Sequence, residues 1–196
     1  MNVDKLVEML KKDMTIDGIV HSRFYHSLGV AEASASLVIK HNLPIDFDKA
    51  YVAGLLHDAT KLIDKTTSKQ MLYNLGYNDE DEIMRSTNVW HGETAPKYVK
   101  EKYGVIDEEI LNAIKYHVMG RPNMTNLEKV VFVADYIEKN RVGKVFEEAR
   151  KIAYIDLDES IRFILKSQID YIKSQNQYLI SQTLKTYEYY KKEGNK

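Results

Sequence analysis

Apolar residues recur at steps of three and four along most of the chain, with only three prolines and nine glycines to interrupt them. This period is that of an amphipathic α-helix, whereas a half-buried strand alternates every second residue. The pattern therefore predicts an all-α protein. The expected helices span residues 3–12, 18–41, 48–61, 67–75, 79–85, 107–117, 127–138, 146–154 and 158–192, with one more running through His91 and Ala95.

Capping residues mark two of these helices. Asp46 or Asp48 can begin the helix that carries residues 57 and 58, and Ser86 or Asn88 can begin the helix of His91. The last helix has an apolar stripe that is interrupted at residues 175–177. The chain shows no repeat, low-complexity segment or linker, so residues 1–196 are expected to form one domain.

Ionisable residues interrupt the apolar pattern at two places. His57 and Asp58 directly follow the apolar residues 52–56, and Asp135 directly follows the apolar residues 130–134. An unpaired imidazole or carboxylate in a buried segment costs several kcal/mol unless it is hydrogen-bonded, neutralised or bound to a metal. Three more histidines lie in separate helical patterns: His26, His91 and His117. The set predicts a metal site in a helical core.

The composition narrows the chemistry of this site. Without cysteine, the metal ligands must be His, Asp or Glu, a set that suits iron, manganese, zinc, nickel or cobalt. A metal ion there can lower the pKa of a bound water and polarise a phosphoryl oxygen. Arg23, Lys61 and Arg141 stand near the candidate ligands in the sequence, which indicates a phosphoester or phosphoanhydride substrate.

The overall charge limits the partners. The net charge is −1, with 28 basic and 29 acidic residues, so we expect no nucleic-acid or membrane partner and only local phosphate-binding groups. The absence of cysteine and of an 18-residue apolar run predicts a cytoplasmic protein.

Each residue also has a simpler interpretation. A single histidine on a helix is more often an ordinary core or surface residue than a ligand, and His57 and Asp58 can pair with each other. Asp135 can pair with a neighbouring cation, and Arg121 and Arg141 can be surface cations. We favour the surface interpretation for Arg121 only, because the ordered set of the other residues is improbable by accident.

Six segments carry a family resemblance: residues 23–30, 53–61, 91–92, 113–117, 120–121 and 133–141. Their order of His, His-Asp, two further histidines and Asp resembles the HD-domain metal-dependent phosphohydrolases, and in particular the YqeK-type symmetrical diadenosine tetraphosphate hydrolases. This resemblance implies an HD-type helical bundle with a long C-terminal helix. It also implies symmetrical cleavage of diadenosine tetraphosphate to two ADP by a metal-activated water.

The resemblance also assigns site residues. It implies iron, or another divalent transition metal, and makes residues 178–183 a cover for the nucleotide. Val118 and Met119 depart from the Thr-Thr pair expected after His117. The implied metal ligands are His26, His57, Asp58 and Asp135; the implied catalytic residues are Asp58, Lys61, His91 and His117. The implied nucleotide-binding residues are Arg23, His26, Asp58, Lys61, His91, His117, Asp135 and Arg141. His91 and His117 either face the phosphates or complete a second metal position.

Other functions stay open at this point. An HD-type nucleotidase or phosphodiesterase would use the same ligands on other nucleotides, a di-iron oxygenase would use them on oxygen, and a nucleotide sensor would bind without turnover. The C-terminal helix can form a homodimer or can pack on its own domain.

Overall fold

Helices make up most of this protein, whose computed structural model describes residues 2–194. The all-α prediction is confirmed, with one small hairpin added. The elements are α1 (Val3–Asp13), β1 (Thr15–Ile16), β2 (Ile19–Val20), α2 (Ser22–Lys40), α3 (Phe47–Leu56), α4 (Lys65–Asn74), the 3-10 helix η1 (Glu82–Arg85), α5 (Trp90–Tyr98), the π-helical turn η2 (Val99–Tyr103), α6 (Glu108–Tyr116), α7 (Asn126–Ile137), α8 (Lys144–Ala153), α9 (Leu157–Ser174) and α10 (Ser181–Glu193).

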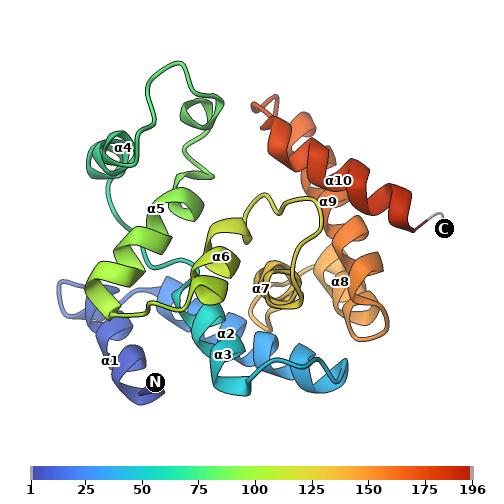
Figure 1. Cartoon of the computed structure of the whole chain (residues 1–196), viewed down its shortest axis with the longest axis horizontal. Coiled ribbons are helices and arrows are strands. Elements are labelled where there is room, and N and C mark those ends of the chain that lie inside the picture. The colour runs from blue at the N-terminus through green and yellow to red at the C-terminus, as the bar shows by residue number, and fades with distance from the viewer. Residues whose placement is uncertain (1, 195–196) are drawn as a thin grey trace.

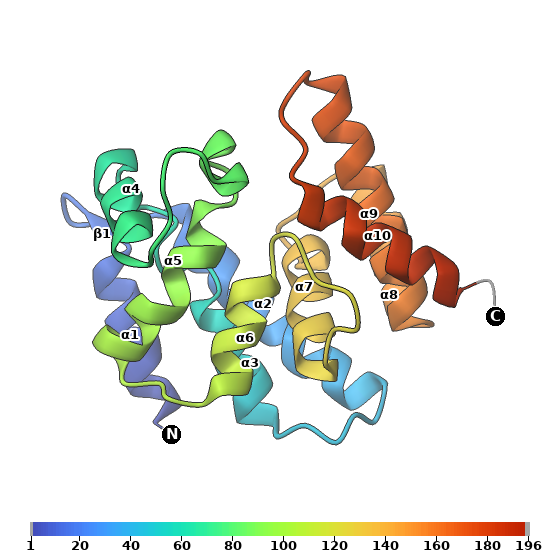
Figure 2. The same ribbon diagram turned by 45° about the horizontal axis from the view of Figure 1, so that its top comes forward.

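Four helices form the middle of the molecule: α2, α3, α6 and α7 (Figures 1 and 2). Helices α1, α4 and α5 lie on one side of them, and α8, α9 and α10 lie on the other. Residues 52–56 of α3 and 130–134 of α7 are all buried, as their continuous apolar runs require. The two runs that carry ionisable residues therefore lie in the core.

Helix α3 ends earlier than the sequence predicts. Asp46 caps its N-terminus by accepting from the Lys49 backbone N–H at 3.0 Å, but the helix stops at Leu56 instead of residue 61. The His57 ring donates through Nδ1 to the Gly54 carbonyl at 2.6 Å, which competes with the helical bond to that oxygen. The chain then continues in tight turns, such as Lys61 N–H to Asp58 carbonyl at 2.9 Å.

The predicted helix 18–41 begins only at Ser22. Asp17 and Gly18 adopt left-handed conformations, with φ of 51° and 77°, and turn the chain between β1 and β2. A helix cannot continue through two such residues, so the hairpin fixes where α2 starts.

Two expectations for residues 79–95 are wrong. The predicted helix 79–85 is reduced to the 3-10 turn η1, and α5 begins after Val89 without a side-chain cap from Ser86 or Asn88. The side chain of Trp90 instead donates to the Ile83 carbonyl at 2.9 Å, which joins α5 to η1. A tertiary contact therefore decides this start.

The prediction of one long C-terminal helix is also wrong. The chain forms two helices, α9 and α10, and the break between them lies where the apolar stripe is interrupted. Asn176 is left-handed, with φ of 51°, and α10 turns back along α9 (Figure 2). The Glu82 carboxylate accepts from the backbone N–H and the hydroxyl of Ser181 at 2.8 and 2.5 Å, and so holds the start of α10. Ile161 and Leu165 of α9 are buried against the chain itself. Among residues 2–194, no helix combines the length and hydropathy needed to cross a membrane.

Close packing of α2 on α3 positions the buried ionisable residues. A Cβ atom on Gly54 would lie 2.9 Å from the Cα of Ala31 and 2.9 Å from the carbonyl oxygen of Val30. Only glycine permits this approach, which sets the end of α3 beside the middle of α2.

Gly54→Ala is expected to lower the free energy of unfolding by about 1–3 kcal/mol, because the backbones of α2 and α3 must separate. In an unhindered helix the same change would stabilise by up to about 1 kcal/mol. Urea denaturation measures the difference. Thr66→Ala, at an exposed position of α4, is the control, and a stabilised Gly54→Ala variant would refute the close-packing argument.

Candidate metal centre

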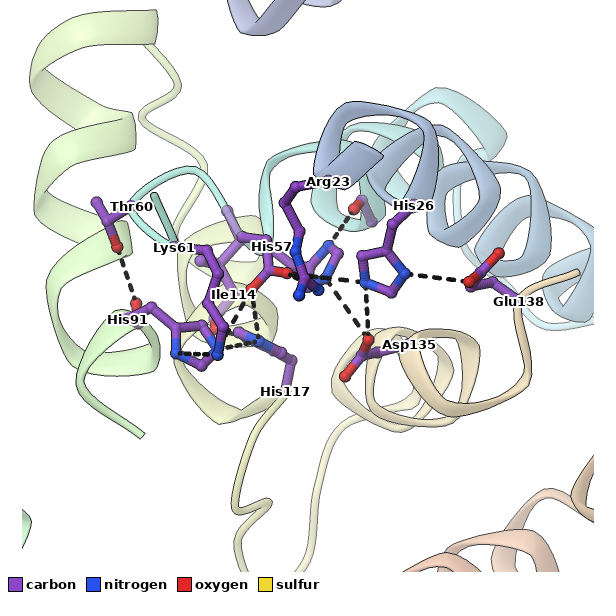
Figure 3. Close-up of polar contacts among 12 residues, drawn as sticks. Arg23, His26, His57, Thr60, Lys61, His91, Ile114, His117, Asp135 and Glu138 are labelled. Carbon is purple, nitrogen blue, oxygen red and sulfur yellow. Dashed lines mark hydrogen bonds and ion pairs between the residues drawn. The ribbon is translucent and has the colours of Figure 1, made fainter. Parts of the chain in front are cut away.

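Residues far apart in the sequence meet between the central helices and α5 (Figure 3). All the predicted histidines and aspartates of the site lie in this one cluster. They are His26 near the start of α2, His57 and Asp58 just after α3, His91 in the first turn of α5, His117 just after α6, and Asp135 in the last turn of α7.

The spacing of four ligand atoms fits one metal ion. Nε2 of His26 lies 3.0 Å from Oδ1 of Asp135 and 3.7 Å from Oδ2 of Asp58. Nε2 of His57 lies 3.4 Å from the same oxygen of Asp58 and 3.7 Å from that of Asp135. Atoms that share an ion at roughly 2.1 Å lie about 3.0–3.4 Å apart. Two of the four separations fall in this range, and the two of 3.7 Å lie just beyond it. Both Nε2 atoms are buried and make no hydrogen bond within residues 2–194, as metal ligands would.

The second ring nitrogen of three histidines fixes their tautomer. Nδ1 of His57 donates to the Gly54 carbonyl, and Nδ1 of His117 donates to the Ile114 carbonyl, each at 2.6 Å. Nδ1 of His26 donates to the Glu138 carboxylate at 3.1 Å. With the proton on Nδ1, each Nε2 presents a lone pair to the cluster.

The electrostatics favour a bound cation. Burial alone would raise the pKa of Asp58, but His57, His91 and His117 hold it well below its usual range. Burial would likewise raise the pKa of Asp135, yet its neighbours His26 and Arg141 keep it well below. Burial lowers the pKa of His57, but Asp58 and Asp135 outweigh it and raise that pKa. The carboxylates thus attract positive charge to the position that the Nε2 atoms surround.

His91 and His117 form the other half of the cluster. Burial lowers the pKa of His117 to about 4 and holds the pKa of His91 well below its usual range, so both rings are neutral at pH 7. The Lys61 ammonium lies 3.2 Å from Nδ1 of His91, which makes Nδ1 the acceptor and places the ring proton on Nε2. That Nε2 faces Nε2 of His117 at 3.1 Å and Oδ1 of Asp58 at 3.3 Å.

The three predicted cations converge on the same cluster. Arg23 donates to Oδ2 of Asp58 at 2.9 Å, and Arg141 donates to Oδ1 of Asp135 at 2.8 Å. Their side chains are 30% and 33% exposed, so both reach solvent at the mouth of the site. Lys61 is also partly buried, and burial lowers its pKa. Such an arrangement can bind a ligand that carries several phosphates.

Sequence reasoning missed the role of Glu138. Its side chain is only 2% exposed. One carboxylate oxygen accepts a hydrogen bond from His26, and the other accepts one from the backbone N–H of Asn140 at 2.7 Å. A carboxylate behind a ligand histidine fixes the ring and increases its basicity. The available signal was a glutamate directly after the apolar residues of α7.

Arg150 of α8 was missed as well. Its Nε donates to the Ile137 carbonyl at 2.6 Å, and its Nη2 donates to the Glu138 carbonyl at 2.7 Å and to the Arg141 carbonyl. One guanidinium therefore fixes the loop that carries both Glu138 and Arg141. No local sequence pattern predicts this contact, because it joins α8 to the end of α7 and the loop that follows it.

The interpretation of Arg121 as an ordinary surface cation is wrong. Arg121 donates to both oxygens of the buried Glu128 carboxylate, through Nε at 2.8 Å and Nη2 at 2.9 Å. It neutralises a charge inside α7 and so has a structural role outside the metal centre.

Comparison with known proteins agrees with this geometry. The HD domain model matches residues 23–140. The chain is 33% identical over 187 residues to the symmetrical bis(5'-nucleosyl)-tetraphosphatase of Halalkalibacterium halodurans, covering 95% of this chain and 96% of that protein. It is also 33% identical over 194 residues to the protein of the same name from Bacillus subtilis, covering 95% and 96%.

A solved structure from Clostridium acetobutylicum, described as a predicted HD superfamily hydrolase involved in NAD metabolism, has the same architecture. It gives a TM-score of 0.89 at 32% identity and covers 98% of each chain. With the family model, the relatives and the ordered His and Asp residues in agreement, this chain belongs to the HD-domain family.

Proposed function

We propose that this protein is a metal-dependent hydrolase that cleaves diadenosine tetraphosphate symmetrically into two ADP. The observation that carries the proposal is the convergence of Arg23, Lys61 and Arg141 on a buried set of metal-ligating atoms. The names of the relatives from H. halodurans and B. subtilis support this substrate. The main cluster of buried residues draws on α1, α2, α3 and on each helix from α5 to α10, which supports one HD-type domain over residues 1–196.

Iron is the metal we propose, held by His26, His57, Asp58 and Asp135. Two imidazoles and two carboxylates without a thiolate suit iron and related divalent transition metals. Such an ion, when bound, lowers the pKa of a water and polarises a phosphoryl oxygen. A second ion beside His91 and His117 would require Lys61 to leave Nδ1 of His91, because the proton now on Nε2 blocks coordination there.

Arg23 and Arg141 are proposed to bind the phosphate chain on one side of the centre. The Arg23 guanidinium uses Nη1 for Asp58, and the Arg141 guanidinium uses Nε and Nη2 for Asp135. Within residues 2–194 their remaining N–H groups have no protein acceptor, so they can donate to phosphate oxygens. The ion pairs with the ligand carboxylates orient both guanidinium groups in advance.

Lys61, His91 and His117 are proposed to contact the reacting phosphoryl groups on the other side. The Nε2–H of His91, which faces the Nε2 lone pair of His117, can donate to a phosphoryl oxygen once it turns from that contact. The Lys61 ammonium neutralises charge that develops during attack. The departing group is ADP, already a stable anion, so electrostatic stabilisation is sufficient and no strong general acid is required.

One nucleoside is proposed to lie in a groove of about 170 Å³ that is lined by Val118 and Met119, the two residues that follow His117. Val118 and Met119 supply apolar surface where the expected threonines would supply hydroxyls, and Tyr178 and Thr183 line the opposite wall. The predicted cover at residues 178–183 thus faces this groove.

Iron-loaded protein incubated with diadenosine tetraphosphate is expected to release ADP as its only nucleotide product, resolved by chromatography. His57→Ala and Asp58→Asn are expected to lower kcat by more than about 100-fold, because each removes a metal ligand. Asp48→Asn, an exposed change in α3, is the control. Release of AMP and ATP would refute symmetrical cleavage, and nucleotide binding without any product would favour the sensor.

Glu138→Gln is expected to weaken metal binding about tenfold or more, because the loss of its charge makes the His26 ring a poorer ligand. Titration against a chelator measures the dissociation constant. Glu32→Gln removes a carboxylate that is exposed and pairs with Lys139, and it should leave the metal affinity unchanged. Equal affinities for wild type and the folded Glu138→Gln variant would remove Glu138 from the proposed support of the site.

Lys61→Met is expected to lower kcat/KM about 100-fold while the metal affinity stays within about twofold, since the ammonium acts on phosphate. Lys65→Met, at the exposed start of α4, is the matched control. Steady-state kinetics combined with metal titration separates the two effects. A parallel loss of bound metal would instead make Lys61 a support of the metal ligands.

A further inference from the structure

A second groove opens on the side of the metal centre away from His91 and His117. It has a volume of about 440 Å³, and its walls come from the start of α2 and the loop after α7. The residues that line it are Ser22, Arg23, Tyr25, His26, Glu138, Asn140 and Arg141. The groove therefore starts at two of the proposed phosphate-binding cations.

The two oxygens of Asp58 face different parts of the cluster. Oδ2 faces Arg23 at 2.9 Å and the ligand nitrogens of His26 and His57, whereas Oδ1 faces His91 at 3.3 Å and His117 at 3.8 Å. Figure 3 shows the same division, with His26 and Glu138 on one side and Lys61, His91 and His117 on the other. A ligand group that leaves the centre on the side of His26 enters the second groove, which His26, Arg23 and Arg141 line.

Tyr25 gives the second groove an aromatic wall. Its side chain is on α2 two residues from Arg23, and the residue is 55% exposed. The ring contacts Phe24 edge to face, with centroids 5.6 Å apart, and its hydroxyl has no hydrogen-bond partner within residues 2–194. An accessible aromatic ring beside cations is the arrangement that stacks on nucleobases.

Asn140 adds a polar group to the same groove. Its backbone N–H is used by Glu138, but its side-chain amide makes no hydrogen bond within the described residues. An amide offers one acceptor and two donor hydrogens, which can pair with the edge of a base.

We propose that this groove is the subsite for the second nucleoside diphosphate half of the substrate, with Tyr25 stacked on its base and Arg23 and Arg141 on its phosphates. The proposal rests on the proposed function: a substrate cut at its centre has two equal halves, and only one of them can occupy the groove lined by Val118 and Met119. The groove beside Tyr25 accepts the other half from the same centre.

The first test is steady-state hydrolysis of diadenosine tetraphosphate by the iron-loaded full chain. Tyr25→Leu is expected to raise KM about 5- to 10-fold with kcat within about twofold, because a base loses its stacking partner. Tyr25→Phe keeps the ring and is expected to retain the wild-type KM. Phe47→Leu removes an exposed aromatic residue outside both grooves and serves as the control. An unchanged KM for Tyr25→Leu would overturn the subsite.

A second readout separates this inference from the proposed function. If the wild type hydrolyses no diadenosine tetraphosphate, the proposed function fails and the subsite is judged by binding. ADP is then titrated into Tyr25→Trp, with the wild type, whose single tryptophan is the buried Trp90, as reference. Quenching of fluorescence beyond that of the wild type supports the subsite, and equal quenching overturns it.

Discussion

The buried carboxylate of Asp58 is the constraint on which the rest of the site depends. Its side chain is 3% exposed, and a buried charge without partners would cost several kcal/mol. Helix α2 contributes Arg23, α5 contributes His91, and the end of α6 contributes His117 to its surroundings. The helices that pack together here therefore also supply the partners that the Asp58 carboxylate needs. A divalent metal ion would neutralise the remaining negative charge of Asp58 and Asp135.

Helix ends supply the ligands of the centre. His57 and His117 each follow the last residue of a helix, and each ring bonds the carbonyl three residues earlier, which is one of the carbonyls that a helix end leaves without a partner. The same bond stops the helix and sets the tautomer of the imidazole. Two histidines of the cluster, one a proposed metal ligand and one a proposed phosphate contact, thus have the same local arrangement at the ends of α3 and α6. It needs no distant residue to orient the ring.

The loop after α7 depends on longer-range contacts. Glu138 behind His26 and Arg141 against Asp135 both lie within this loop, and Arg150 holds its carbonyls from α8. Charges in this protein act locally, since the chain as a whole carries a net charge of −1. Three cations around one buried cluster therefore select a polyphosphate over a nucleic-acid surface. The groove lined by Arg23, His26 and Arg141 adjoins this cluster directly and gives an extended ligand room beside the ligand residues.

The sequence by itself determined the helical class, most of the helices and the members of the metal centre, because those features are local or leave a local trace. An ionisable residue at the end of a buried apolar run, as at Asp58 and Asp135, needs a partner wherever the chain goes. Only the tertiary structure decided the roles of Glu138 and Arg150, the pairing of Arg121 with Glu128, and the break between α9 and α10. Each of these features depends on which segments contact one another in the folded protein. The hydrophobic periodicity of one segment does not specify those contacts.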